Sequence, residues 1–204
     1  MTTARRVLIL ITVITAVVAA RDYLPLDDAD FVYELTYNIL DAVSVETAHR
    51  AVGSTGWEPD RWGPPADGEL YVFDDPSHRV MYQYLRRDGD SLRVLEFYNN
   101  LGTWEELPFV IQLPLEAGDT WKCDGWSASV TEAGAVTTPA GEFADCLLLG
   151  FIEDEADEDG FQQSWELTLA PELGPVAESR RWAEREGWSA VLTEHELYAD
   201  VPSD

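Results

Sequence analysis

Lysine, cysteine and histidine are all scarce in this chain. Lys122 is the only lysine, and 13 Lys and Arg face 39 Asp and Glu, which gives a formal net charge of −26. A surface of this sign repels phosphates and anionic headgroups, so it excludes nucleic acid and anionic membrane surfaces as partners. The acidity itself has two interpretations. It reflects either a saline habitat, where salt screens self-repulsion, or an acidic binding face.

The few cysteines and histidines leave little room for metal or redox chemistry. Cys123 and Cys146 do not form a C-x-x-C pair, which disfavours redox catalysis. His49, His78 and His195 lack Cys or His neighbours at metal-site spacing, so we expect them at the surface. In an exported chain, two cysteines favour one disulfide. A Cys123–Cys146 bridge would close a loop of 24 residues and contribute about 3 kcal/mol.

Export is predicted by the first twenty residues. Arg5 and Arg6 precede an apolar run at 7–18, and Val-Ala-Ala at 18–20 fits the small-x-small rule of signal peptidase. We therefore predict a signal peptide at 1–20 and a periplasmic or extracellular chain from Arg21. An uncleaved N-terminal membrane anchor is the alternative. We predict one β-domain over 21–204, or two related halves at 21–108 and 109–204.

The rest of the chain predicts short strands. Residues 31–38 (FVYELTYN) alternate between apolar and polar side chains, as in a half-buried strand. Asp88-Gly89 predicts a hairpin turn between strands at 78–86 and 91–98. Further strands are expected at 41–52, 69–73, 120–123, 127–131, 136–138, 143–152, 163–169, 177–182 and 188–198. A short helix is the alternative within 41–52, because Ala42, Val45 and Ala48 have helical spacing. The predicted fold class is mainly β with little helix: an antiparallel meander that forms a strongly curved sheet, or a partly closed barrel or sandwich.

Some segments are assigned to connections. We expect loops at 54–68, 99–106 and 153–160, and a turn at Ala133-Gly134. Residues 180–186 form either strand and turn or one helical turn.

The acidic loop also has the spacing of a calcium site. Glu155, Asp157, Asp159 and Glu166 occupy positions 1, 3, 5 and 12 of such a loop, and Gly160 occupies position 6. Glu fits the first position poorly, and the flanks predict strands rather than helices. A solvated hairpin loop is therefore the favoured interpretation, with no cofactor or metal in the chain.

Aromatic side chains are the remaining signal. Eight Trp, eight Tyr and seven Phe argue against disorder. We expect Trp121, Trp165 and Tyr33 to fill the concave core. The loop residues Trp57, Trp62 and Trp104 would either anchor loops or form the rim of a groove for a sugar or an apolar ligand.

Several motifs together resemble a family. Residues 23–26 read Tyr-Leu-Pro-Leu, residues 114–121 fit Pro-Leu-x-x-Gly-x-x-Trp, and residues 138–146 fit Thr-Pro-Ala-Gly-x-Phe-x-x-Cys. This pattern resembles a group of uncharacterised exported bacterial β-domains, many of them lipoproteins. The chain departs from it at 28–30, where Asp-Ala-Asp replaces Gly, and at 172–174, where Glu-Leu-Gly replaces Gly-Val-Gly. The resemblance implies an antiparallel β fold and no assigned activity.

No catalytic motif competes with this interpretation. The chain contains no Gly-x-Ser-x-Gly elbow, phosphate loop or dinucleotide fingerprint. With so many carboxylates, no pair of them is diagnostic of glycoside hydrolysis. The sequence favours an exported non-enzymatic β-domain that binds a protein partner or serves the cell envelope structurally. A carrier of an apolar or sugar ligand on a curved sheet is the alternative, and a hydrolase ranks third. The sequence does not indicate an oligomeric state.

Overall fold

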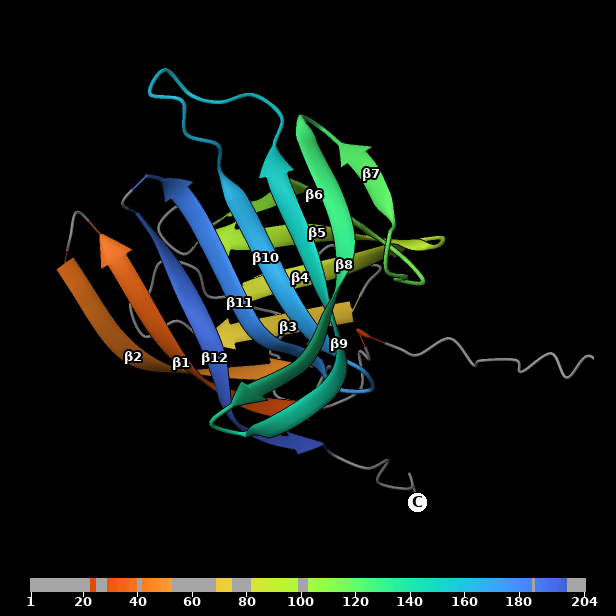
Figure 1. Ribbon diagram of the computed structural model, residues 1–204, viewed down its shortest axis with the longest axis vertical. Helices are drawn as coiled ribbons and strands as arrows, with labels where there is room; N and C mark the ends of the chain where they lie inside the picture. The colour runs from red at the N-terminus through yellow and green to blue at the C-terminus, as the bar shows by residue number, and fades with distance from the viewer. Residues whose placement is uncertain are drawn as a thin grey trace, which may run out of the picture.

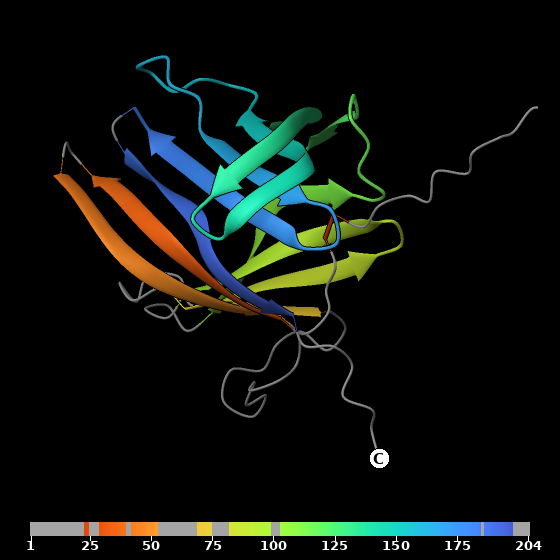
Figure 2. The same cartoon turned by 60° about the horizontal axis from the view of Figure 1, so that its bottom comes forward.

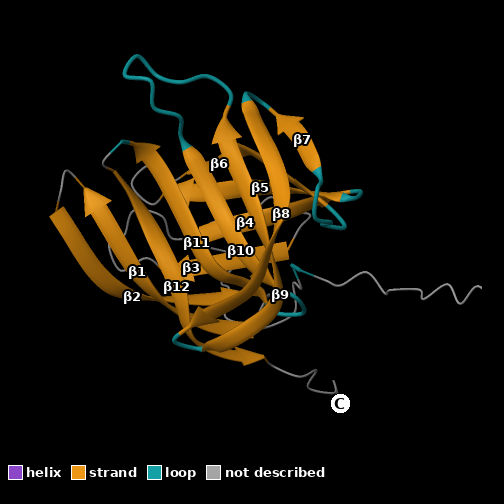
Figure 3. Ribbon diagram, viewed as in Figure 1, coloured by secondary structure: helices purple, strands orange, loops and turns teal. Residues whose placement is uncertain are grey.

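The fold consists of β-strands and their connections. A computed structural model describes residues 23–24, 29–39, 42–52, 69–74, 82–98, 103–184 and 186–197. Every regular element among them is a strand, as Figure 3 shows. Within these described ranges, no helix is long and apolar enough to cross a membrane. The predicted signal peptide at 1–20 lies outside the described residues.

Twelve strands follow one another along the chain. The first six are β1 (Ala29–Ile39), β2 (Ala42–Val52), β3 (Glu69–Asp74), β4 (Tyr82–Asp88), β5 (Ser91–Tyr98) and β6 (Thr103–Gln112). The second six are β7 (Thr120–Cys123), β8 (Trp126–Thr138), β9 (Gly141–Glu153), β10 (Ser164–Ala170), β11 (Gly174–Ala183) and β12 (Glu186–Leu197).

All twelve strands belong to one antiparallel sheet. Its order is β6-β5-β4-β3-β2-β1-β12-β11-β10-β9-β8-β7. Each half of the chain is therefore a six-stranded meander, and the two meanders join where β1 pairs with β12 (Figure 1). The predicted mainly β, antiparallel, strongly curved fold is confirmed. Whether the halves are related in sequence stays a prediction.

The sheet curls until its two ends face each other. Phe109 on β6 lies among three rings from the other half, at centroid distances of 4.7 Å from Trp165, 4.8 Å from Trp126 and 5.2 Å from Phe151. The indole N–H of Trp121 on β7 donates to the Val110 carbonyl on β6, with an N···O distance of 2.7 Å. The two terminal strands of the sheet, β6 and β7, therefore lie against each other (Figures 1 and 2).

Strand alternation decides which side chains lie inside this curl. On β1, Phe31, Tyr33 and Leu35 are buried, as the pattern at 31–38 predicts. The buried Tyr33 hydroxyl donates to the Pro175 carbonyl at 2.7 Å, which satisfies its polar end. Trp165 is buried as predicted, and Trp121 is partly buried against the core.

The β8–β9 hairpin differs from its predicted form. The turn predicted at Ala133-Gly134 is wrong, because β8 continues to Thr138 through a bulge centred on Gly134. Gly134 has φ of 72°, a conformation that glycine adopts without steric strain, so it bends the strand instead of ending it. The tip of the long hairpin then reaches β12, where Ala140 N donates to the Leu192 carbonyl at 3.3 Å. Figure 2 shows the hairpin folded across this end of the molecule.

Two other local assignments are corrected. The loop predicted at 99–106 ends earlier, because β6 begins at Thr103 and pairs with β5. Residues 180–183 are strand rather than helix, because β11 pairs with β12 as far as Ala183.

Candidate functional site

The outer face of the sheet carries three rows of side chains that cross neighbouring strands from β2 towards β7. Strand register places one residue from each strand in a row. The first row is Val45, Thr36, Ser189, Ser179, Glu166, Gly150, Ser129 and Thr120. The second is Thr47, Glu34, Val191, Ala177, Thr168, Leu148 and Thr131. The third is Val43, Asn38, Gly187, Arg181, Ser164, Ile152, Ser127 and Lys122.

These rows, which we call the outer face, carry little charge. They contain two acids, Glu34 and Glu166, and two bases, Arg181 and Lys122. The outer face therefore has no net charge, although the chain carries −26. Most other positions are small hydroxyl or aliphatic residues. Three exposed large apolar side chains also lie on it: Val43, Val45 and Ile152, at 65%, 58% and 45% exposure.

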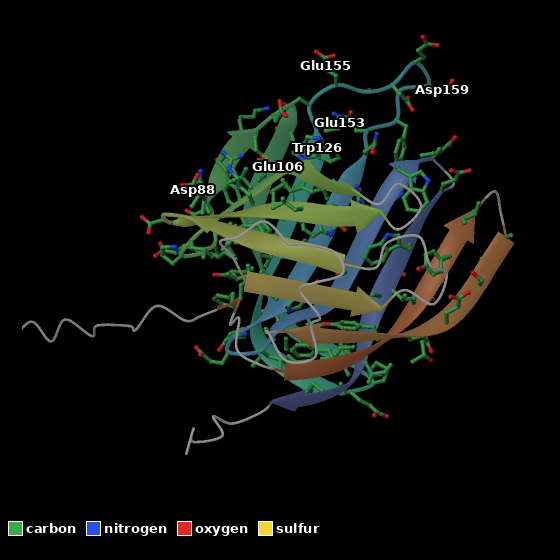
Figure 4. The ribbon with its side chains drawn as sticks, turned by 180° about the vertical axis from the view of Figure 1, so that it is seen from behind. Asp88, Glu106, Trp126, Glu153, Glu155 and Asp159 are labelled. Atoms are coloured by element: carbon green, nitrogen blue, oxygen red, sulfur yellow. The ribbon has the colours of Figure 1, made fainter. Side chains whose placement is uncertain are left out.

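The acids concentrate in a connection instead. Six of the seven residues 153–159 are Asp or Glu, and they join β9 to β10. Figure 4 shows Glu155 and Asp159 on this loop, beyond the end of the strands. Most positions of the three rows therefore take Ser, Thr, Ala, Val or Gly, while acids concentrate in this loop and also occur on strands beyond the rows, as at the exposed Glu194 on β12.

A polar cluster lies at one margin of the outer face. The Lys122 ammonium donates to the Ser127 hydroxyl and to Oδ1 of Asp154, both at 2.6 Å. The Ser127 hydroxyl donates to the same Asp154 oxygen. The hydrogen bond from Lys122, followed by that from Ser127, lowers the pKa of the Asp154 carboxyl. The cluster joins the start of the acidic loop to β7 and β8.

This cluster resembles a Ser–Lys nucleophile in composition but not in environment. Activation of a serine by lysine requires a neutral, desolvated amine. The Lys122 side chain is 70% exposed and paired with a carboxylate, so it lacks the desolvated environment that such activation needs. This cluster was not predicted from the sequence. The fact that Lys122 is the only lysine of the chain was the one signal that could have drawn attention to it.

Aromatic side chains pack on the inner face where the two ends of the sheet meet. Phe151 and Trp165 stack at 5.3 Å with an interplanar angle of 17°. Glu178 is only 3% exposed among them and accepts a hydrogen bond from the Trp165 indole at 2.7 Å. The Arg180 guanidinium lies 5.6 Å from the centre of the Phe109 ring. These contacts hold polar groups in defined positions within a packed interior.

The predicted disulfide is not formed. Cys123 and Cys146 are both free and both buried. Cys123 pairs with Trp126, which pairs with Glu153 on β9, and Cys146 lies seven residues earlier on β9. At ~3.3 Å per residue this is roughly 20 Å of strand, far beyond the ~7 Å that a disulfide allows between Cα atoms. Burial raises the pKa of both thiols.

The calcium candidates are not brought together. Oδ1 of Asp157 accepts the backbone N–H groups of Asp159 and Phe161, at 3.0 and 2.8 Å, and so closes its own turn. Glu166 lies on β10 and accepts from the Ser179 hydroxyl at 3.3 Å. Among the residues with a described position, no group of three or more His, Cys, Asp or Glu side chains is arranged to hold a metal.

The remaining candidates are scattered. Trp57 and Trp62 lie outside the described residues, as does His78, and Trp104 falls within β6. His195 is exposed on β12, with its ring 6.1 Å from that of Phe143. A tryptophan-lined ligand rim stays a prediction.

Comparison with known proteins yields distant likenesses only. No family model and no curated protein matches the sequence. A "putative lipoprotein" from Parabacteroides distasonis ATCC 8503 has a TM-score of 0.48 and 12% identity, with 87% of this chain and 99% of that chain covered. A "putative exported protein with YmcC-like fold" from Bacteroides fragilis NCTC 9343 has a TM-score of 0.41 and 12% identity, covering 83% and 96%. At this identity the likenesses indicate nothing about shared chemistry.

Proposed function

We propose that this protein is an exported, non-enzymatic domain that docks a macromolecular partner on the outer face of its sheet. The observation that carries the proposal is the absence of net charge on that face in a chain of −26. Charged residues are depleted from the centres of protein interfaces, because burying an unmatched charge is costly. A surface used only for solubility would have no reason to exclude carboxylates.

The size of the outer face supports docking. Eight strands at ~4.8 Å spacing give a width of about 40 Å, and the three rows give a height of about 15 Å. The resulting area, on the order of 600 Å², approaches the ~800 Å² per partner of a standard interface. Val43, Val45 and Ile152 add exposed apolar area within it.

The packed interior favours this function over that of a ligand carrier. A carrier holds its ligand in an open apolar cavity of about 300 Å³ or more. Where the two ends of this sheet meet, Phe109, Trp126, Phe151 and Trp165 are in ring contact. The space that a ligand would occupy there is taken by these side chains.

Export is part of the proposal and rests on residues 1–20. Mass spectrometry of the protein purified from its native host should give an N-terminus at Arg21. A chain that retains the apolar run at 7–18 would indicate an anchor instead.

Photo-cross-linking in the native host tests the docking surface. A photoreactive amino acid at Thr168 or Ser129 on the outer face should give an adduct of discrete mass, whereas one at Glu158 in the acidic loop should not. A second change, Ser189→Glu, should abolish the Thr168 adduct by placing a charge on the outer face. The matched change Ala156→Glu adds the same charge in the loop and should leave the adduct unchanged. Equal adduct yields from face and loop positions would refute the proposal.

A further inference from the structure

Strand β2 has an open edge over more than half of its length. It pairs with β1 from Ala42 to Val52, but its other neighbour, β3, pairs only with His49 to Val52. Among the described residues, the segment 42–48 therefore has no strand beside its second edge. On that side its backbone N–H and C=O groups have no strand partner in the described part of the chain, as at the edge of a sheet.

The terminal edges of the sheet, at β6 and β7, are covered by side chains, unlike the edge of β2. At β6 and β7, Trp121 covers the Val110 carbonyl, and Phe109 inserts among rings of the other half. The only lysine of the chain, Lys122, also lies on β7. Lysine, proline, covering side chains and inward-pointing charges are the usual protection against unwanted strand pairing. The segment 42–48 (AVSVETA) contains neither lysine nor proline, and Glu46 is its one inward-pointing charge, which disfavours an incoming strand that lacks a cation.

The side chains of this segment indicate what would pair with it. Val43 and Val45 are exposed on the outer face. Glu46 faces the other side, opposite the buried Leu35. Its Oε2 atom is buried, and no hydrogen-bond partner for it exists among the described residues. A buried carboxylate oxygen without a partner is costly, and a cation beside it would remove that cost.

We infer that the open edge of β2 at 42–48 binds an extended peptide segment of a partner protein, which adds as a strand and places a Lys or Arg beside Glu46. The inference rests on the proposed docking function and names the chemistry of the partner. Residues directly opposite on paired strands have Cβ atoms about 5 Å apart, within reach of a basic side chain. The added strand would continue the outer face beyond Val43 and Val45, where small or apolar side chains fit. Main-chain hydrogen bonds would provide affinity and the cation would provide selectivity.

A second copy of this chain fits the edge less well. The segment 42–48 carries no cation, so an antiparallel copy of it cannot neutralise Glu46. A copy centred on Glu46 would place two carboxylates opposite each other, which is destabilising. Each copy would also add its charge of −26 to the complex. Charge complementarity therefore selects a basic segment from another protein.

Labelled peptides test the assignment directly. The probes are nine-residue peptides of alternating Thr and Val with either Lys or Glu at the centre, measured by fluorescence anisotropy in low salt. The wild-type protein should bind the Lys peptide about fivefold more tightly than the Glu peptide, the effect of a favourable cross-strand charge pair. Glu46→Gln should remove this preference, and Glu46→Lys should reverse it. Glu158→Lys makes the same charge change in the acidic loop, away from the edge and the outer face, and should preserve the Lys preference.

Amide hydrogen exchange distinguishes edge pairing from binding to the outer face. The amides of residues 42–48 that face the open edge should gain protection when the Lys peptide is bound. Val45→Lys, which gives the edge the usual protection, should weaken both peptides. The inference is wrong if binding does not saturate, if Glu46→Lys leaves the preference unchanged, or if protection appears elsewhere. It is also wrong if sedimentation shows a wild-type dimer that Val45→Lys dissociates, because a second copy then occupies the edge. If the edge assignment fails but photo-cross-links from Thr168 persist in Glu46→Lys, the docking function proposed above still stands.

Discussion

The glycines of the outer face provide a sharp test of the register on which the site depends. A Cβ added at Gly187 would lie 2.5 Å from the Arg180 carbonyl oxygen, and 3.2 Å from Cα and Cγ of Arg181. The first contact is with backbone, which cannot rotate away. The neighbouring strands β11 and β12 would have to separate locally by several tenths of an ångström. Overpacking of this kind costs about 1–3 kcal/mol, so Gly187→Ala should be destabilising.

The same substitution at Gly150 should have the opposite sign. There the added Cβ would meet only Ser129 Oγ at 3.8 Å, an ordinary van der Waals contact. Neither Gly150 nor Gly187 has a positive φ, so alanine is not strained by the backbone at either position. Glycine within a strand costs roughly 0.5–1 kcal/mol relative to alanine, mainly through chain entropy. Gly150→Ala should therefore be neutral or slightly stabilising.

Urea denaturation followed by tryptophan fluorescence measures both changes. In a domain of this size, 1 kcal/mol shifts the melting temperature by about 2–4 °C, so a thermal melt should separate the two variants. The m-value should stay constant if only the native state is affected. Equal stabilities for the two variants, or a stable Gly187→Ala protein, would refute the β11–β12 register and with it the assignment of the three rows.

Three further predictions concern interactions around the site. Lys122→Met removes the hydrogen bond that contributes most to lowering the pKa of Asp154 below its ordinary value of 3.8, and keeps the smaller contribution from Ser127. The wild type should therefore exceed the variant in stability above that value and lose the advantage as the pH falls through the lowered pKa, measured by urea melts between pH 2 and 7; a pH-independent difference would contradict this. Cys123 and Cys146 are buried thiols, so Ellman's reagent should react slowly with the native protein, whereas in urea it should react readily with both thiols. A reductant should leave the melting temperature unchanged. Trp165→Phe removes the donor to buried Glu178 and should cost about 1–3 kcal/mol by chemical denaturation; an unchanged midpoint would show that this hydrogen bond contributes nothing.

Local patterns predicted the strands well because each depends on neighbours in sequence. The alternation at 31–38 and the Asp88-Gly89 turn both appear in the structure, in β1 and between β4 and β5. The failure at Ala133-Gly134 has a physical reason. A glycine with positive φ is required both by a turn and by a bulge, and only the pairing of β8 with β9 distinguishes them.

The disulfide prediction failed because sequence distance is a poor guide to distance in a sheet. Cys123 and Cys146 are separated by a hairpin, and hairpin partners can lie close together. The bulge and the long β8–β9 arm place Cys146 opposite Gly134, while Cys123 pairs with Trp126 at the other end of β8. Neither the length of that arm nor its register is encoded in the spacing of the two cysteines.

The outer face could not be predicted from the sequence for a related reason. Its rows combine residues from eight strands, and a shift of one residue in any ladder would exchange inner for outer side chains. Alternation along β1 alone distinguishes Glu34 and Thr36 from buried Tyr33 and Leu35. The alignment of Thr36 with Ser189 on β12 depends on a register that only the structure supplies.

The placement of the acids bears on what the net charge does. An acidic binding face would require carboxylates on a broad surface, yet the outer face balances Glu34 and Glu166 against Arg181 and Lys122. The densest acidic run, residues 153–159, lies in a connection beyond the strand ends (Figure 4). Charge at that position keeps copies of the chain apart, because like charges repel over about 10 Å at moderate salt. A neutral sheet with an open edge at β2 would otherwise invite self-pairing. The same negative charge attracts a basic segment, so the acidity and Glu46, whose Oε2 has no hydrogen-bond partner among the described residues, select the same class of partner.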